Sequence, residues 1–562
     1  MHIIDMLVIA VYFVFITGLG FYMARYVHKS SEFFMPRRFG TGMMTMHAFG
    51  TGTASDQAVA VAAATFRGGL SGIWYQWLWL FSTPFYWLIA PIFRRFRAIT
   101  TADVYELRFD ASVGMLFSAV GIANLVVKIG LLLIGAGVLI EASSGAQIPT
   151  NVAIGVLTIM VVAYGVAGGL GAAIVTDYIQ GFLIVIFSFI LLPLVLLEVG
   201  GMSGVRETIT EPGMLSLIAP DRITTFFVVM MAIQALVGIV AQPFTMGVCA
   251  AGRTEWEGRF GMMVGNFLKR FCTVAWSLTA IAAVAWYIQR GVSPEDVNPD
   301  LIFGEVAQAF LPVGLLGVFV AAILAGIMSS CDSYMISSSA LFTKNVYSRW
   351  VRNQSASHYL AVGRLASVAI VVGGVLFAWW VPDVLTALEI WFMIAPMMGM
   401  VFWIALLWRR MTVIGAWTTT LAGFATWWLT ARGWFVSWVE TWAMTESWRL
   451  VWDGAIHLPW QILAYLTVGT ASGILVSLVT RPVAEEKLKR FYQLTRTPVQ
   501  PGEEITEPCT VPPDSVSAER PMLITAFGLE VPRPSKTSVI GFALGWVLVL
   551  VIVVVFAWYV RG

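Results

Sequence analysis

The chain has 562 residues and a net charge of +2, with 58 % apolar and only 12 % charged residues. An average soluble domain carries about 25 % charged residues, so this composition and a mean hydropathy of +0.81 exclude a soluble protein and a disordered one. We expect an all-α polytopic membrane protein that contacts the lipid bilayer. The near-neutral charge gives no sign of a nucleic-acid partner, and no obligate protein partner is evident.

The sequence lacks the motifs that usually mark metal-dependent or nucleotide-dependent enzymes and pumps. The four cysteines form no C-x-x-C pair, the five histidines are scattered, and no G-x-x-x-x-G-K-[ST] motif is present. We therefore expect no catalytic residues and no nucleotide-driven pump.

Apolar stretches recur along the chain, and a span needs about 20 apolar residues, which predicts roughly fourteen membrane helices. The predicted spans are 5–25, 43–66, 72–93, 112–140, 150–167, 171–198, 223–250, 262–288, 313–346, 359–380, 384–408, 411–430, 460–480 and 538–560. An even number of spans places both termini on the same side of the membrane.

Lysine and arginine predict the orientation, because they are enriched in cytoplasmic loops. With the N-terminus outside, 26 of the 34 basic residues are assigned to cytoplasmic segments, including Arg25, Lys29, Lys269 and Arg270. Lys128 is the only one assigned to the interior of a span. We expect a multi-pass protein of the cell membrane with both termini extracytoplasmic.

The second predicted span is a poor continuous helix. It reads FGTGTASDQAVAVAAATF, with two glycines and Asp56 near its middle. A charged residue at the bilayer centre costs about 2.5–3.5 kcal/mol, and non-helical backbone is tolerated there only against protein or a water-filled cavity. The pattern predicts a discontinuous helix whose freed carbonyls can ligate a cation.

The seventh span has a similar interruption, with Gln234, Gln242 and Pro243. Each broken helix begins a set of five spans. Because five is an odd number, the second set is inverted in the membrane relative to the first, which predicts two inverted repeats with a site between them. The predicted regions are an N-terminal helix and loop at 1–42, a first repeat at 43–198, an outer loop at 199–222, a second repeat at 223–408, and C-terminal helices at 409–562 with a partly ordered cytoplasmic loop at 481–536.

Three motifs carry a family resemblance: ASDQ at 54–57, YGVAGGLGAAIVTDYIQ at 164–180 and LAGIMSSCDSYMISSSALFTKNVYSR at 324–349. Together they resemble the sodium:solute symporter family, which includes sodium-coupled sugar, proline, pantothenate and sialic acid transporters. The resemblance implies a LeuT-like fold with a 5+5 inverted-repeat core, one extra N-terminal helix and three extra C-terminal helices.

The resemblance also implies a sodium ion as the coupling ion. Sodium favours several uncharged oxygens, and adjacent hydroxyls facing a broken helix supply them. The implied ligands are the hydroxyls of Ser329 and Ser330 and the carbonyls of Gly326, Ala54 and Gln57. The alternative is that Ser329 and Ser330 serve helix–helix packing, as small residues do in membrane helices.

A second cation site is implied at Asp177, Asp332 and Ser333. Some members of the family bind a second sodium at the position of Asp177. Because Asp332 adds a charge where those members carry a hydroxyl, a second sodium, a proton and a pairing partner all remain open.

The predicted solute site departs from that of the family's sugar carriers, since several of their hydrogen-bonding positions are apolar here. A sugar would lose about 1–3 kcal/mol for each polar group left unpaired. The candidate solute-binding residues are Ser55, Asp56, Gln76, Lys128, Gln234, Lys269, Glu389 and Trp391.

Lys128 is the most informative of these candidates, because an ionisable residue inside a span indicates a functional site. It could pair with Asp56 or Glu389, or attract a carboxylate solute. The alternative is a side chain that reaches the outer interface.

These features predict a symporter that imports a small polar organic solute with sodium by alternating access. The alternatives are a proton-coupled carrier on the same fold, with Asp56 or Asp332 as the proton site, and a carrier-like solute sensor. The identity of the solute and the stoichiometry stay open.

Overall fold

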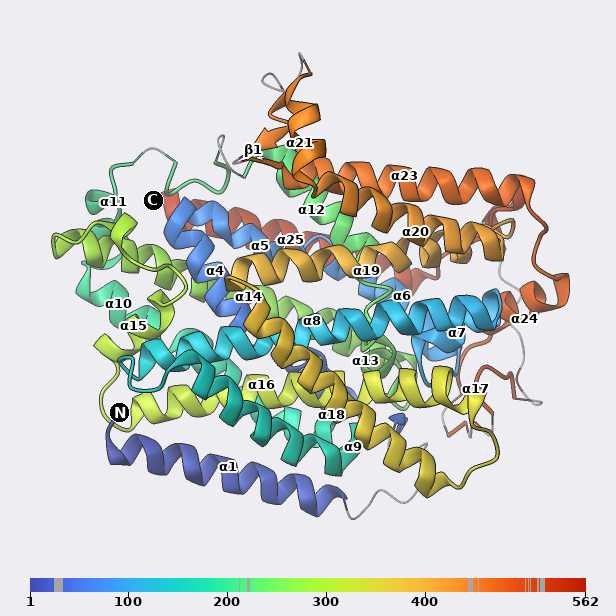
Figure 1. The fold of residues 1–562 in the computed structure, drawn as a ribbon, viewed down its shortest axis with the longest axis horizontal. Helices are drawn as coiled ribbons and strands as arrows, with labels where there is room; N and C mark the ends of the chain where they lie inside the picture. The colour runs from blue at the N-terminus through green and yellow to red at the C-terminus, as the bar shows by residue number, and fades with distance from the viewer. Residues whose placement is uncertain are drawn as a thin grey trace.

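A computed structural model of the chain shows long helices lying side by side (Figure 1). It describes every residue except 25–33, 212, 220–222, 443–447, 453, 501, 504, 506, 513–514, 516–520 and 562, and it gives no side chains at 20–21, 23–24 and 164–169. Arg25 and Lys29, which contributed to the predicted orientation, lie outside the described residues.

The first half of the chain supplies the helices before the second break. Their bounds are α1 (Ile3–Ala24), α3 (Thr41–Gly50), α4 (Ser55–Gly68), η1 (Leu70–Ile73), α5 (Trp74–Trp77), η2 (Thr83–Phe85), α6 (Tyr86–Arg95), α7 (Thr101–Arg108), α8 (Ala111–Ser143), α9 (Thr150–Phe189), α10 (Leu191–Glu198) and α11 (Gly201–Thr208).

The second half continues with a matching set and the C-terminal helices. Their bounds are α12 (Thr225–Gly238), α13 (Thr245–Ala250), α14 (Glu255–Gln289), η3 (Pro294–Asp296), α15 (Ile302–Phe310), α16 (Leu315–Ala340), η4 (Leu341–Tyr347), α17 (Ser348–Trp350), α18 (Ala356–Trp380), α19 (Val384–Leu407), α20 (Val413–Thr430), α21 (Gly433–Glu440), α23 (Leu458–Val479), α24 (Glu485–Arg496), η5 (Ala526–Gly528) and α25 (Lys536–Arg561). Two short antiparallel hairpins pair β1 (Val451–Trp452) with β2 (Ala455–Ile456) and β3 (Met522–Ile524) with β4 (Val531–Pro532).

In the described part of the chain, eight helices are long and apolar enough to cross a membrane, and three shorter helices are apolar. The other predicted spans correspond to the interrupted pair α3 and α4, to the segment from η1 to α6, and to α20. The predicted helical membrane architecture is therefore confirmed.

Both predicted helix breaks are present. Between α3 and α4 the backbone leaves the helix, and Gly52 takes a φ of +81°, a conformation that glycine adopts without steric cost. Between α12 and α13 the break includes Pro243, which has no N–H to donate to a helix. Each break leaves backbone groups that need other partners.

The two breaks lie against long buried helices. α14 packs against α3, and α16 packs against α9 and α8. Gly265 of α14 allows this close approach, because a Cβ there would lie 2.8 Å from the Thr45 carbonyl oxygen of α3. The hydrophobic core thus holds both broken helices between rigid neighbours.

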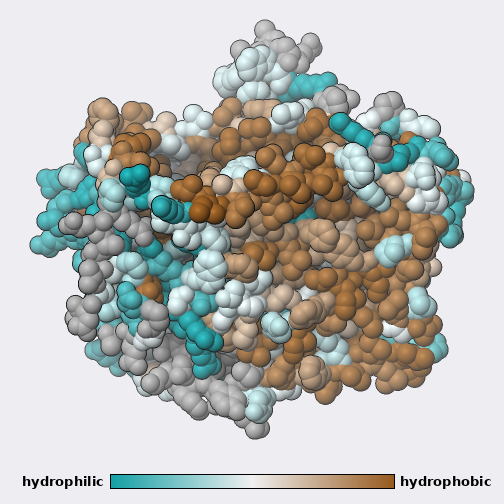
Figure 2. Space-filling model, turned by 180° about the vertical axis from the view of Figure 1, so that it is seen from behind, coloured by the Kyte–Doolittle hydropathy of each residue, from teal (hydrophilic) through white to brown (hydrophobic). Residues whose placement is uncertain are grey.

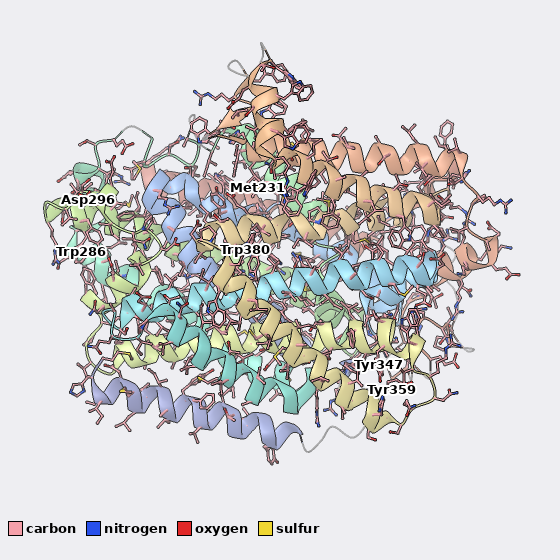
Figure 3. The ribbon with its side chains drawn as sticks, viewed as in Figure 1. Met231, Trp286, Asp296, Tyr347, Tyr359 and Trp380 are labelled. Carbon is pink, nitrogen blue, oxygen red and sulfur yellow. The ribbon has the colours of Figure 1, made fainter. Side chains whose placement is uncertain are left out.

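The two termini lie at the same end of the bundle (Figure 1), as an even number of spans requires. Figure 2 shows a broad hydrophobic surface with hydrophilic residues gathered towards the ends, and exposed apolar side chains line the outer helices α1 and α25. Aromatic residues also occur near both ends: Figure 3 labels Trp286 at one end, and Tyr347 and Tyr359, whose ring centroids are 6.5 Å apart, at the other.

The segment 481–536 carries more structure than its composition predicts. α24 buries Leu488, Phe491, Tyr492 and Leu494 and packs against α7 and α6. The polar, proline-bearing sequence concealed this amphipathic helix, since its apolar residues recur at helical spacing within a charged stretch.

Candidate functional site

The break between α3 and α4 is held by polar side chains from other helices. The Ser330 hydroxyl of α16 accepts a hydrogen bond from the Gly52 N–H at 3.1 Å and donates to the Gly50 carbonyl at 3.3 Å. The Lys269 ammonium of α14 donates to the Thr51 carbonyl at 2.5 Å. The freed backbone groups of the break therefore face α16 and α14.

Ser329 lies beside the same break. A Cβ on Gly50 would lie 2.6 Å from the Ser329 hydroxyl oxygen, so the two residues are in direct contact. That hydroxyl is fully buried and has no hydrogen-bond partner among the described residues. A buried, unpaired oxygen facing freed carbonyls suits an uncharged ligand set for a cation.

The structure brings most of the predicted sodium ligands together. Gly326 lies one turn before Ser329 on α16, and a Cβ there would lie 3.2 Å from the Ala54 Cα. Gln57 lies one turn after Ala54, in the first turn of α4, and its side-chain amide donates to the Gly52 carbonyl. The donor set is made of hydroxyl and carbonyl oxygens without a fixed charge, which fits sodium.

The predicted second cation group contains a residue that the sequence did not single out. The His47 Nδ1 lies 2.6 Å from the Asp177 carboxylate, and both side chains are fully buried. The Thr51 hydroxyl contacts His47 Nδ1 at 3.3 Å and the Ser333 hydroxyl at 3.2 Å. His47 thus contacts Asp177, one of the three residues of the predicted second cation site.

Asp332 is buried on α16, one residue before Ser333. Asp177 contacts His47, and Ser333 contacts Thr51. A role for Asp177, Asp332 and Ser333 in binding a second cation stays a prediction.

A central cavity adjoins the break. Three of the predicted solute-binding residues line it: Gln76, Lys269 and Trp391. Gln57, Tyr334 and Arg270 line it too. Arg270 donates to the Gln76 carbonyl and, at 3.3 Å, to the Gln76 side-chain oxygen.

Lys269 and Arg270 correct the predicted distribution of charge. The sequence analysis assigned both to a cytoplasmic segment, but they lie in the middle of α14, and both are buried. The predicted span 262–288 already contained both residues, and they lie inside the helix Glu255–Gln289, so their assignment to a cytoplasmic segment is wrong. Lys128 is therefore one of several basic residues inside the bundle.

Lys128 is fully buried and does not reach an interface. Its ammonium lies 2.6 Å from the Asp56 carboxylate and 4.3 Å from the centre of the Trp391 ring. The alternative of a lysine that extends to the membrane surface is excluded, and so is a pair with Glu389. The Lys128–Asp56 pair ties α8 to the start of α4.

The remaining predicted solute-binding residues lie outside the lining of this cavity. Gln234 donates to the Phe392 carbonyl at 2.8 Å, and Glu389 accepts a hydrogen bond from the Tyr75 hydroxyl at 3.0 Å. Ser55 is buried at the start of α4. Any role for these residues in binding solute stays a prediction.

Sequence reasoning missed His47 and Arg270. Each has a weak signal: His47 stands in an apolar segment three residues before the glycine that ends α3, and Arg270 follows Lys269 between two apolar stretches. A polar residue inside an apolar helix is costly unless it has a partner. That cost was a usable signal at both positions.

The fold and the site together define a class of protein. Two interrupted helices face each other inside an apolar bundle, and polar groups at the first interruption surround a buried cavity. This arrangement is that of a membrane transporter with a central binding site.

The comparison with known families makes this assignment specific. The model of the sodium:solute symporter family matches residues 33–423, and the chain belongs to this family. It is therefore a multi-pass membrane protein of a family of sodium-coupled transporters, with sodium as the coupling ion. The resemblance found in the sequence motifs is confirmed.

Characterised relatives carry different solutes. The chain is 28 % identical to the high-affinity proline transporter PutP of Bacillus subtilis, over 66 % of this chain and 79 % of that protein. It is 26 % identical to the sodium/glucose cotransporter of Vibrio parahaemolyticus, over 74 % of this chain and 82 % of the relative. It is 25 % identical to the sodium/pantothenate symporter of Haemophilus influenzae, over 60 % and 71 %.

Solved structures show the fold. A sodium-coupled sialic acid symporter, in a substrate-bound outward-open state, matches with a TM-score of 0.68 at 17 % identity, over 86 % of this chain and 99 % of the other. A transporter of the nucleobase-cation-symport family, in a closed conformation, matches with a TM-score of 0.51 at 10 % identity, over 81 % and 98 %. The predicted LeuT-like fold is thereby confirmed.

Proposed function

We propose that this chain imports a small polar organic solute together with sodium, by alternating access to the central cavity. The observation that carries the proposal is the contact between the broken helix α3–α4 and the two serines of α16, which gathers uncharged oxygens next to the cavity. The carbonyls of Ala54, Gln57 and Gly326 and the hydroxyls of Ser329 and Ser330 would hold the ion.

Sodium bound beside the cavity would couple the binding of the ion directly to the binding of the solute. Thr51 and Gly52 belong to the break and also line the cavity, so an ion at the break fixes part of the wall that the solute contacts. One positive charge moving down a membrane potential supplies about 2.3 kcal/mol per 100 mV. We place the chain in the cell membrane with both termini extracytoplasmic, in agreement with the positions of its basic loops.

The proton-coupled alternative has two candidate sites, and one of them is engaged in an ion pair. Asp56 was one candidate for a transported proton, but its carboxylate is bound by the Lys128 ammonium. Asp332 is the remaining candidate of that alternative.

Uptake into proteoliposomes tests the proposed function. The purified chain is reconstituted, and labelled amino acids, sugars, carboxylates and vitamins are offered with an inward sodium gradient or with sodium replaced by choline, at the same pH on both sides. We expect at least one solute to accumulate only with sodium. Accumulation driven by a pH gradient without sodium would contradict the proposal.

A further inference from the structure

We propose that the transported solute is a carboxylate anion, held in the central cavity by the ammonium of Lys269 and the guanidinium of Arg270. This inference rests on the proposed function and narrows it to one class of solute. It starts from the charge of the cavity. Among the described residues, the lining contains these two basic side chains and no acidic one.

Neither cation has a carboxylate partner within the described part of the chain. The Lys269 ammonium donates to the Thr51 carbonyl, and Arg270 donates to the Gln76 carbonyl and amide oxygen. A carbonyl dipole satisfies one donor but cancels no charge. The Arg270 Nε has no hydrogen-bond partner among the described residues, so the guanidinium has at least one donor without an acceptor.

The neighbouring carboxylates contact other groups, and in the described part of the chain none of them lies within ion-pair distance of Lys269 or Arg270. Asp56 is paired with Lys128 at 2.6 Å, and Asp177 contacts His47 at 2.6 Å. Glu389 accepts from the Tyr75 hydroxyl. A buried charge without a counter-charge is costly, and an anionic solute would supply the missing one.

The other polar atoms of the cavity also suit an acceptor-rich solute. The Arg270 bond fixes the oxygen side of the Gln76 amide, which leaves its Nε2 as a donor without a partner in the described residues. The Tyr334 hydroxyl also has no partner there. A carboxylate has several acceptor positions and no donor, so it matches this set of donors.

The same lining argues against a zwitterion. An amino acid carries an ammonium group that needs a carboxylate or several acceptors when it is buried. The described lining offers neutral acceptors such as the Gln57 side-chain oxygen, but no carboxylate to pair with an ammonium. The apolar wall of Trp79, Phe244 and Trp391 suits the hydrocarbon part of an organic acid.

A panel of matched solutes tests the charge class. Carboxylates of two to six carbons, with and without a 2-hydroxyl group, are compared with their own amides and with the corresponding amino acids, for example lactate, lactamide and L-alanine. Sodium-driven uptake into proteoliposomes is measured for each at pH 7. We expect the solute with the highest uptake to be a carboxylate and its amide to be carried poorly.

Two results of this panel distinguish a failure of the anion inference from a failure of the proposed function. Sodium-driven uptake of a neutral or zwitterionic solute, with no carboxylate carried, would overturn the anion inference and leave the proposed function standing. A complete lack of sodium stimulation for the panel and for the broader solute set would overturn the proposed function itself.

Variants test the two residues. For the best carboxylate, Lys269→Gln and Arg270→Gln should each raise KM by about ten- to a hundredfold, the effect of losing one charge-assisted hydrogen bond. Equilibrium binding of ²²Na⁺ to the Arg270→Gln variant should stay near that of the parent, because Arg270 contacts Gln76 and not the break. Lys344→Gln is the matched control, because this lysine is paired with Asp103 outside the cavity. The KM of this variant for the same carboxylate should not change. An unchanged KM in both cavity variants, in protein that still binds sodium, would overturn the assignment.

Discussion

Basic side chains in two regions of the molecule have opposite surroundings. At the end of the bundle formed by α6, α7 and the segment after α23, two arginines face carboxylates: Arg95 lies 2.6 Å from Glu255, and Arg97 lies 2.5 Å from Glu503. The buried Arg94 and Arg108 of the same end donate to backbone carbonyls. In the central cavity, Lys269 and Arg270 contact carbonyl oxygens instead. Arg95 and Arg97 are neutralised by carboxylates of the protein, whereas the two cations that line the cavity have no carboxylate partner in the described part of the chain.

The comparison indicates which charges serve structure and which serve ligands. Lys344 and Asp103 form a third pair in the first region at 2.6 Å, and Asn345 adds a hydrogen bond to the same carboxylate at 2.8 Å. Lys128 and Asp56 lie near the cavity but follow the structural pattern, because each satisfies the other. A charge-by-charge mutational survey can test this division.

The largest effect is expected at the Lys128–Asp56 pair. Lys128→Met leaves the Asp56 carboxylate buried without its cation, which costs about 3–5 kcal/mol in pairs of this kind. The free energy of unfolding, measured by denaturant titration in detergent, should fall by that amount. Adding Asp56→Asn to the same chain should recover much of the loss. If the single variant is as stable as the parent, the pair has no structural role.

A smaller, pH-dependent effect is expected at Asp103. Burial alone would raise the pKa of this carboxyl, but the charge of Lys344 and hydrogen bonds from Lys344 and Asn345 outweigh burial and lower the pKa. The ionised form therefore stabilises the fold above the ordinary carboxyl pKa of about 4, and this stabilisation is lost as the pH falls through the folded pKa.

Asp103→Asn should therefore lower the free energy of unfolding at pH 7 by about 1–3 kcal/mol. The difference from the parent should shrink as the pH is lowered below about 4. Unfolding curves at several pH values measure both quantities. A difference that stays constant with pH would show that the Asp103 charge is not what stabilises this region.

The smallest effect is expected at the partly exposed arginine of the same region. Arg409 lies 2.6 Å from Glu530, and its side chain is 29 % exposed. Solvent screens such pairs, so Arg409→Gln should change the free energy of unfolding by less than about 1 kcal/mol. A loss as large as that of Lys128→Met would remove the distinction between buried and exposed pairs.

The backbone features of the site were predictable from the sequence because they depend on local chemistry. Gly50 and Gly52 near Asp56 cannot form a stable continuous helix in a membrane, and Pro243 interrupts the second helix in the same way. The break positions and the facing serines followed from these residues and from the motif at 324–349.

The partners of the charged side chains were not predictable to the same degree. The Lys128–Asp56 pair joins α8 to α4, so it depends on how two helices far apart in the sequence pack together. Lys269 and Arg270 were misassigned because they form a basic pair between two apolar stretches of α14 and were counted with the loop before the helix. Local hydropathy does not report where a charged residue lies along a partly polar helix.

Equilibrium binding of ²²Na⁺ to the purified chain tests the central claim most directly, because it needs no knowledge of the solute. The parent should bind sodium saturably, Ser329→Ala combined with Ser330→Ala should abolish that binding, and Lys344→Gln, which lies away from the break, should retain it. A double serine variant that is folded and binds sodium with the affinity of the parent would contradict the site built on the break and α16.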